Sequence, residues 1–118
     1  VKNSFINHDE KILVEVKFNN FILDCNIGVA LLNSSKSKVF TTVKAIDSRT
    51  DCIYCEIPSN LLLKGAYSFD VATFKNELVF EYVHDICLFQ IVDLINDYKI
   101  YGDNIGDIKV NCRWSLNL

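Results

Sequence analysis

Cysteine is the residue type in this chain with the most scope for metal or redox chemistry. Cys52 and Cys55 form a C-x-x-C motif, and the other three cysteines are isolated in the sequence. Successive side chains of a strand point to opposite faces, so residues i and i+3 of a strand cannot share a metal ion. A zinc site would also need a second ligand pair. We therefore expect no metal and no cofactor, and we interpret Cys55 and Cys87 as small core residues.

His84 and Asp85 are the second candidate for chemistry, because a histidine beside a carboxylate can form half of a catalytic pair. Adjacent side chains at the start of a strand diverge, however. No serine or cysteine in a nucleophile context such as G-x-S-x-G accompanies them. We therefore expect no enzymatic activity, and we expect Asp85 to accept backbone hydrogen bonds in a turn before its strand.

The composition of the chain limits the classes of partner that it is expected to bind. The chain has 118 residues, half of them apolar, with 12 Lys and Arg against 15 Asp and Glu. The basic residues are scattered singly, which argues against nucleic acid or an anionic membrane surface. No apolar run approaches the roughly 20 residues of a membrane-spanning helix. Methionine is absent, including at position 1, so we expect a domain excised from a longer protein. The five cysteines are an odd number and need not pair in a chain with a sufficient core, which favours a reducing compartment.

The elements that must position any site are strands. Apolar and polar residues alternate in short segments separated by turn formers, and no segment has helical spacing over three turns. We expect strands over 11–18, 25–32, 39–43, 52–57, 66–74, 78–82, 85–92 and 108–116. Residues 1–9 are expected to be a linker and 93–107 a long loop. This pattern predicts one antiparallel β-sandwich over residues 1–118.

The alternation also assigns faces to the strands. The inward set is predicted to be Ile12, Val14, Val16, Ile27, Val29, Leu31, Ile57, Tyr67, Phe69, Val71, Phe89 and Ile91. The opposite face carries Asn26, Gly28 and Ala30 on one strand and Ser68, Asp70, Ala72 and Phe74 on another. Small residues there would let a ligand approach, polar ones would hydrogen-bond it, and an aromatic would stack on it. A solvated sheet face or a dimer interface fits each of these residues at least as well.

Several short motifs in this order and spacing resemble one family. They are Glu56-Ile57-Pro58, Leu61 to Leu63, Gly65-Ala66-Tyr67, Asp85 leading to Phe89-Gln90-Ile91, and Gly106 before Trp114. The sequence over about residues 10 to 115 resembles the C-terminal domain of Wzt, the ATPase subunit of bacterial ABC transporters that export O-antigen polysaccharide. The resemblance implies an immunoglobulin-like, jelly-roll-like sandwich of seven to nine strands.

In function, the resemblance implies a cytoplasmic domain that binds the polysaccharide for export at the inner face of the inner membrane. The transporter membrane subunit would be a partner through an ATPase domain absent here. No P-loop GxxxxGK[ST] occurs in this chain, so we expect no ATP binding. The alternative is a structural or docking module appended to a transporter ATPase or to a glycan-modifying enzyme.

The site prediction combines the resemblance with the outward sheet face. The candidate carbohydrate-binding residues are Asn26, Gly28, Tyr54, Ser68, Asp70, Phe74 and Arg113. Asp70 is expected to accept hydrogen bonds from sugar hydroxyls, and Phe74 or Tyr54 to stack. We interpret Trp114 and Tyr67 as packing residues. We also expect a homodimer in which the segment from Ile108 to Leu116 pairs with the neighbouring subunit, since the loop before it gives that segment reach.

Overall fold

The chain forms strands and no helix in the part that the computed structural model describes, residues 4–92 and 105–116. The seven strands are β1 (Ser4–Asn7), β2 (Ile12–Ile22), β3 (Cys25–Leu32), β4 (Lys38–Ile46), β5 (Thr50–Ile57), β6 (Gly65–Lys75) and β7 (Leu78–Val92). The all-β prediction is therefore confirmed. Within those ranges no helix is long and apolar enough to cross a membrane.

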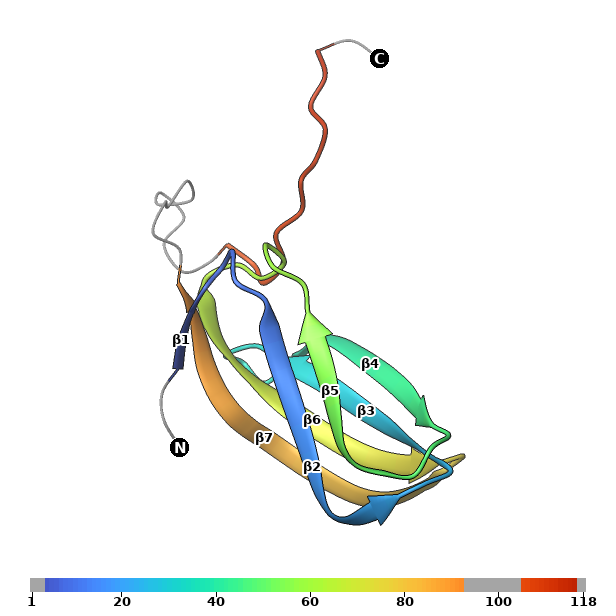
Figure 1. Ribbon diagram of the computed structural model, residues 1–118. Helices are drawn as coiled ribbons and strands as arrows, with labels where there is room; N and C mark the ends of the chain where they lie inside the picture. Colours follow the sequence, from blue (N-terminus) through green and yellow to red (C-terminus); the bar gives the residue numbers. More distant parts are fainter. Residues whose placement is uncertain (1–3, 93–104, 117–118) are drawn as a thin grey trace.

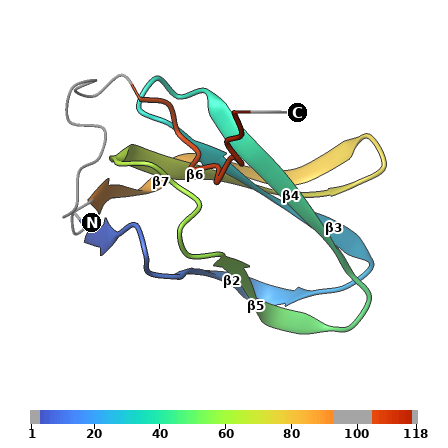
Figure 2. The ribbon, with the colours of Figure 1, turned by 90° about the horizontal axis from the view of Figure 1, so that it is seen from above.

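The strands form two layers, as Figures 1 and 2 show. A five-stranded sheet has the order β1-β7-β6-β3-β4, and β2 pairs with β5 in a second sheet that lies across it. The neighbours are antiparallel, except for β1 and β7, which are parallel. The predicted sandwich is confirmed, with one parallel pair at its edge that the sequence pattern did not predict.

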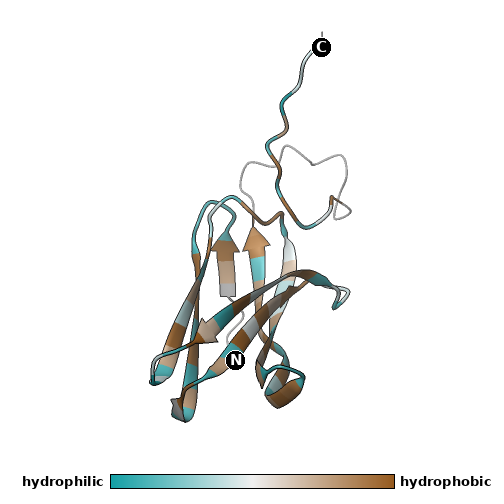
Figure 3. Ribbon diagram, turned by 90° about the vertical axis from the view of Figure 1, so that its right-hand side faces the viewer, coloured by the Kyte–Doolittle hydropathy of each residue, from teal (hydrophilic) through white to brown (hydrophobic). Residues whose placement is uncertain are grey.

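The core lies between the layers. Leu31, Ile57 and Tyr67 are almost fully buried, and the ring of Phe89 stacks at 5.7 Å from that of Tyr67 and 5.5 Å from that of Phe69. Nine of the twelve residues predicted to be inside are buried, and the other three, all valines, are partly buried against the core. In Figure 3 hydrophobic segments alternate with hydrophilic ones along the strands.

The segment expected to be a linker contains a strand. Residues 1–3 lie outside the described residues, but Ser4–Asn7 forms β1 and pairs with the end of β7, Ile6 opposite Ile91. The amide of His8 continues this contact with a 3.0 Å hydrogen bond to the carbonyl of Val92. The edge of β7 offers backbone groups with which Ser4–Asn7 pairs, and Ile6 of this segment packs against the core.

The two strands expected over 78–82 and 85–92 are one strand, β7. Its pairing with β6 shifts register at three bulges, and at two of them Asp85 and Cys87 have the positive φ angles 56° and 57°. Each bulge adds a residue and reverses the alternation of faces. As a result Ile86 packs against the core, and Cys87, predicted to be a core residue, is exposed. The expectation that Asp85 precedes its strand in a turn is also wrong.

The last expected strand, 108–116, does not form. Ile108 makes a single bridge to Leu62, and residues 109–116 lie in no strand. Figure 1 shows this segment running away from the sandwich. Lys109 at its start donates a 2.6 Å hydrogen bond to the carbonyl of Leu61, and among the described residues strand pairing goes no further than Ile108. Most of the expected long loop, 93–104, lies outside the described residues, so its prediction has no structural counterpart.

Candidate functional site

The outer face of the five-stranded sheet brings the predicted β3 and β6 residues together. In the register, Asn26 lies opposite Phe74, Gly28 opposite Ala72 and Ala30 opposite Asp70. The intervening residues of both strands face the core, so this set points away from the β2–β5 layer. The sequence pattern thus predicted the correct face and the correct neighbours.

A shallow hollow of about 160 Å³ lies on this face. Its floor is made by small residues, Gly28, Ala30 and Ala72, and the rings of Phe74 and Tyr82 line it. A Cβ atom at position 28 would lie 3.4 Å from Cε1 of Phe74, so the ring of Phe74 lies directly against this glycine. The absence of a side chain at Gly28 therefore sets both the depth of the hollow and the position of the ring.

Asp70 also faces outward but is only 4% exposed. Its Oδ2 accepts a 2.6 Å hydrogen bond from the hydroxyl of Tyr82, and its Oδ1 accepts a 2.8 Å bond from the amide of Asp85. Nδ1 of His84 lies 2.6 Å from the same Oδ1. Burial works against the charged carboxylate, but these hydrogen bonds outweigh it and lower the pKa of Asp70.

The role of Asp70 therefore differs from the predicted one. Both carboxylate oxygens of Asp70 are occupied by protein donors, so Asp70 orients its neighbours instead of presenting a free acceptor to a sugar. Ser68 is likewise buried, at 0% exposure, and its Oγ donates to Oδ1 of Asp85. Ser68 and Asp70 belong to the face, as predicted, but they lie beneath its surface.

The carboxylate of Asp85 belongs to the same hydrogen-bond network. Oδ1 of Asp85 also accepts a 2.9 Å hydrogen bond from Nζ of Lys36, which comes from the turn between β3 and β4. The bonds from Ser68 and Lys36 lower the pKa of Asp85. Because the bulge places the backbone amide of Asp85 toward Asp70, this residue joins the two carboxylate clusters into one hydrogen-bonded group.

Tyr82 and His84 are the aromatic members of this group, and neither is among the predicted carbohydrate-binding residues. Their rings stack with centroids 6.1 Å apart and an interplanar angle of 19°. Tyr82 is 54% exposed, and the side chain of His84 is 59% exposed. The predicted alternation of 78–82 could have placed Tyr82 outward beside Ala72, but no local signal indicates that His84 pairs with Asp70 instead of Asp85.

Two of the predicted site residues lie elsewhere. Tyr54 is on β5, in the two-stranded layer, whereas the hollow is on the far side of the other sheet. Arg113 lies in the segment 109–116 and does not line the hollow. The structure therefore groups Asn26, Gly28, Ser68, Asp70 and Phe74 and separates them from Tyr54 and Arg113.

The C-x-x-C cysteines lie on β5, where Cys52 pairs with Lys17 and Cys55 with Val14. Burial raises the pKa of the Cys55 thiol. Among the described residues, no group of three or more His, Cys, Asp and Glu side chains is arranged to hold a metal ion.

A scan against protein-family models and a search of curated proteins found no match to this chain. The resemblance to the C-terminal domain of Wzt therefore rests on the order and spacing of the sequence motifs.

Proposed function

We propose that this domain binds a cell-surface polysaccharide of the O-antigen type through the outer face of its five-stranded sheet and performs no chemistry on it. In this proposal the domain acts in the cytoplasm, at the inner face of the bacterial inner membrane, and a linked ATPase connects it to the transporter membrane subunit.

One observation carries the proposal: a hollow floored by Gly28 and Ala72 lies between the rings of Phe74 and Tyr82. Sugar rings present apolar C–H faces, which pack on aromatic side chains, and hydroxyl groups, which need hydrogen-bond partners. Lys38 and Thr41 supply polar groups at the same hollow. An open, shallow site of this kind suits a passing polymer better than an enclosed pocket does.

The Asp70 network supports the proposal by fixing the position of Tyr82. A tyrosine ring held by a short hydrogen bond loses less rotational freedom on binding than a free ring does. A site from which the polymer must move on should nevertheless be weak, and we expect dissociation constants of about micromolar to millimolar. Tethering such a site to an exporter would raise the local concentration of polymer.

The test is titration of the domain with the polysaccharide of its own source, by calorimetry. We expect Phe74→Ala and Tyr82→Ala each to weaken binding at least roughly tenfold, as loss of a stacking ring does. Tyr54→Ala is the matched control, because Tyr54 is as exposed as Tyr82 but lies on the other layer. If both variants fold and bind as the parent does, the outer face is not the site.

A docking module is the second candidate function. Leu78, Val79 and Phe80 at the start of β7 are all more than half exposed, and adjoining exposed apolar side chains are typical of a protein interface. If the parent domain binds no glycan from its own source, this function takes the place of glycan binding.

A further inference from the structure

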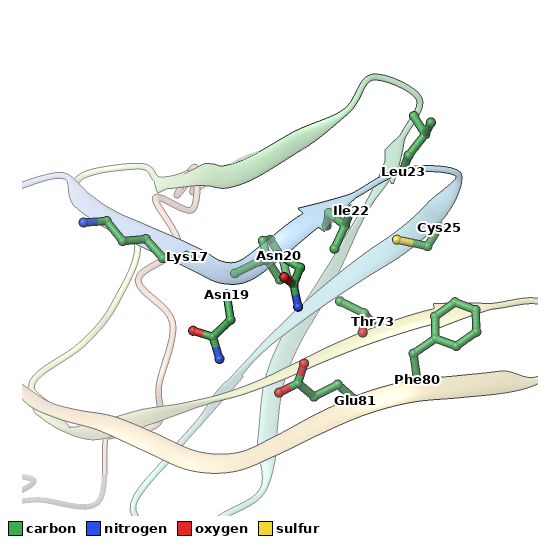
Figure 4. A pocket seen from close by; sticks show the side chains of 10 residues that line it. Lys17, Asn19, Asn20, Ile22, Leu23, Cys25, Thr73, Phe80 and Glu81 are labelled. Atoms are coloured by element: carbon green, nitrogen blue, oxygen red, sulfur yellow. The ribbon is translucent and has the colours of Figure 1, made fainter.

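A cleft separate from the outer face opens at one side of the sandwich, between β2 and the inner side of β6 and β7. Its volume is about 560 Å³, within the range of small-molecule sites. Figure 4 shows β2 above it and β7 below, with side chains from both entering the space between them.

The cleft follows from an interruption in the β2–β5 ladder. The two strands pair regularly as far as Lys17 and Cys52, and the next pair is Ile22 with Thr50. Between these pairs the register shifts, and Asn19 and Asn20 lie in the irregular stretch. An irregularity of this kind bends a strand and redirects its side chains. Asn19 and Asn20 both line the cleft as a result.

Four polar side chains meet there without partners. Asn19 and Asn20 enter from β2, Thr73 from β6 and Glu81 from β7, as Figure 4 shows. Within residues 4–92 and 105–116, none of these four side chains has a hydrogen bond or an ion pair. Thr73 is only 8% exposed. The two amides can each donate and accept, the hydroxyl can do both, and the carboxylate accepts only.

Apart from Lys17, the remaining walls are apolar and include two aromatic rings. Phe18 and Phe80 both line the cleft, and Phe80 is 54% exposed. An exposed ring beside unpartnered amides and a carboxylate is the combination that holds a sugar, with stacking on one side and hydrogen bonds on the other.

The charged side chains of the cleft indicate which class of sugar it could bind. Lys17 also lines the cleft, but its ammonium group is paired with Oε1 of Glu15 at 3.1 Å. Glu81 has no such cation among the described residues. A carboxylate on the ligand would therefore meet the negative charge of Glu81, whereas a hydroxyl would donate to it.

We propose that this cleft is a second saccharide subsite that takes an uncharged, hydroxyl-rich sugar unit and rejects acidic ones. The proposal rests on the proposed glycan-binding function and adds a substrate class to it. Asn19 and Asn20 recognise hydroxyl or acetamido groups, Glu81 accepts from two hydroxyls, and Phe80 packs on the sugar face.

The test follows the side-chain amides of Asn19 and Asn20 by NMR in the whole 118-residue chain. Asn19→Ala and Asn20→Ala assign these signals. The probes are mannose, galactose and N-acetylglucosamine at roughly 50 mM, above the millimolar dissociation constants expected of a single sugar, and glucuronate serves as the acidic counterpart. We expect at least one neutral sugar to shift both amides. Glucuronate should bind roughly fivefold more weakly or worse than that sugar, and Glu81→Gln should remove the difference.

The outcomes separate this inference from the proposed function. Shifts at Gly28 and Ala72 with unmoved Asn19 and Asn20 amides would overturn the subsite and leave the glycan-binding function standing. Equal binding of glucuronate and the neutral sugars by the parent chain would overturn the charge selectivity, and with it the proposed class. No shift at the Asn19 and Asn20 amides with any of the three neutral sugars would overturn the subsite, whereas the glycan-binding function stands or falls with the titration against the source polysaccharide.

Discussion

Tyr82 of β7 donates a 2.6 Å hydrogen bond to Oδ2 of Asp70 on β6, although the sheet register places Tyr82 opposite Ala72. The bond is therefore diagonal across the two strands. It makes the most buried carboxylate of the outer face an anchor for one of its most exposed rings, and it raises the pKa of Tyr82 because the protonated hydroxyl is the donor.

Removing the carboxylate of Asp70 should destabilise the fold. Asp70→Ala leaves the amide of Asp85 and the hydroxyl of Tyr82 without their acceptor, and loss of a buried partner costs about 1 to 3 kcal/mol. Urea unfolding at neutral pH measures the change. Asp51→Ala, at an exposed position of β5, is the control and should stay within about 0.5 kcal/mol of the parent. Equal losses of unfolding free energy in the two variants would contradict the role of Asp70 as the acceptor that holds Tyr82 and Asp85.

The same network predicts a pH dependence. The pKa values of Asp70 and Asp85 are lower in the folded state than the value of about 3.9 in an unfolded chain. Their contribution is therefore present above about pH 4 and is lost as the pH falls through the folded values. The stability difference between the parent and Asp70→Asn should be largest at neutral pH and narrow below about pH 4. A difference that stays constant down to about pH 2.5 would exclude this explanation.

The core between the two sheets should be sensitive to cavity formation. Leu31 is fully buried between the sheets, so Leu31→Ala should lower the free energy of unfolding by about 2 to 5 kcal/mol. Leu13→Ala is a matched control, because Leu13 is 62% exposed on β2. Denaturant midpoints of the two variants, compared with the parent, check the assignment of faces. Similar losses would mean that the two layers do not pack as described.

The segment 109–116 provides the prediction on self-association. Val110 and Leu116 are exposed apolar residues, and Trp114, the only tryptophan of the chain, is 92% exposed. If this segment pairs with a second copy, sedimentation should show a dimer at tens of micromolar, and the emission of Trp114 should shift to the blue as concentration rises. A chain ending at residue 108 should remain monomeric. A parent chain that is only monomeric under these conditions would contradict the expected homodimer.

The sequence by itself determined the class of fold and most of the inward residues. Alternation with period 2 is a local property of a strand, so Ile27, Val29 and Leu31 could be assigned to the core before their partners were known. Pro58 likewise places the end of β5 at Ile57, because proline has no amide to continue the ladder. The face shared by β3 and β6 followed from the same alternation.

Only the tertiary structure decided which residues of that face are accessible and which partners they have. The bulges at Asp85 and Cys87 reverse the faces along β7, and a bulge depends on the strand alongside and not on the local pattern. They bring the amide of Asp85 and the ring of His84 to Asp70, so a residue expected to bind ligand is buried. Tyr54 is separated from the face because strand order, which assigns β5 to the other layer, depends on contacts between residues distant in the sequence.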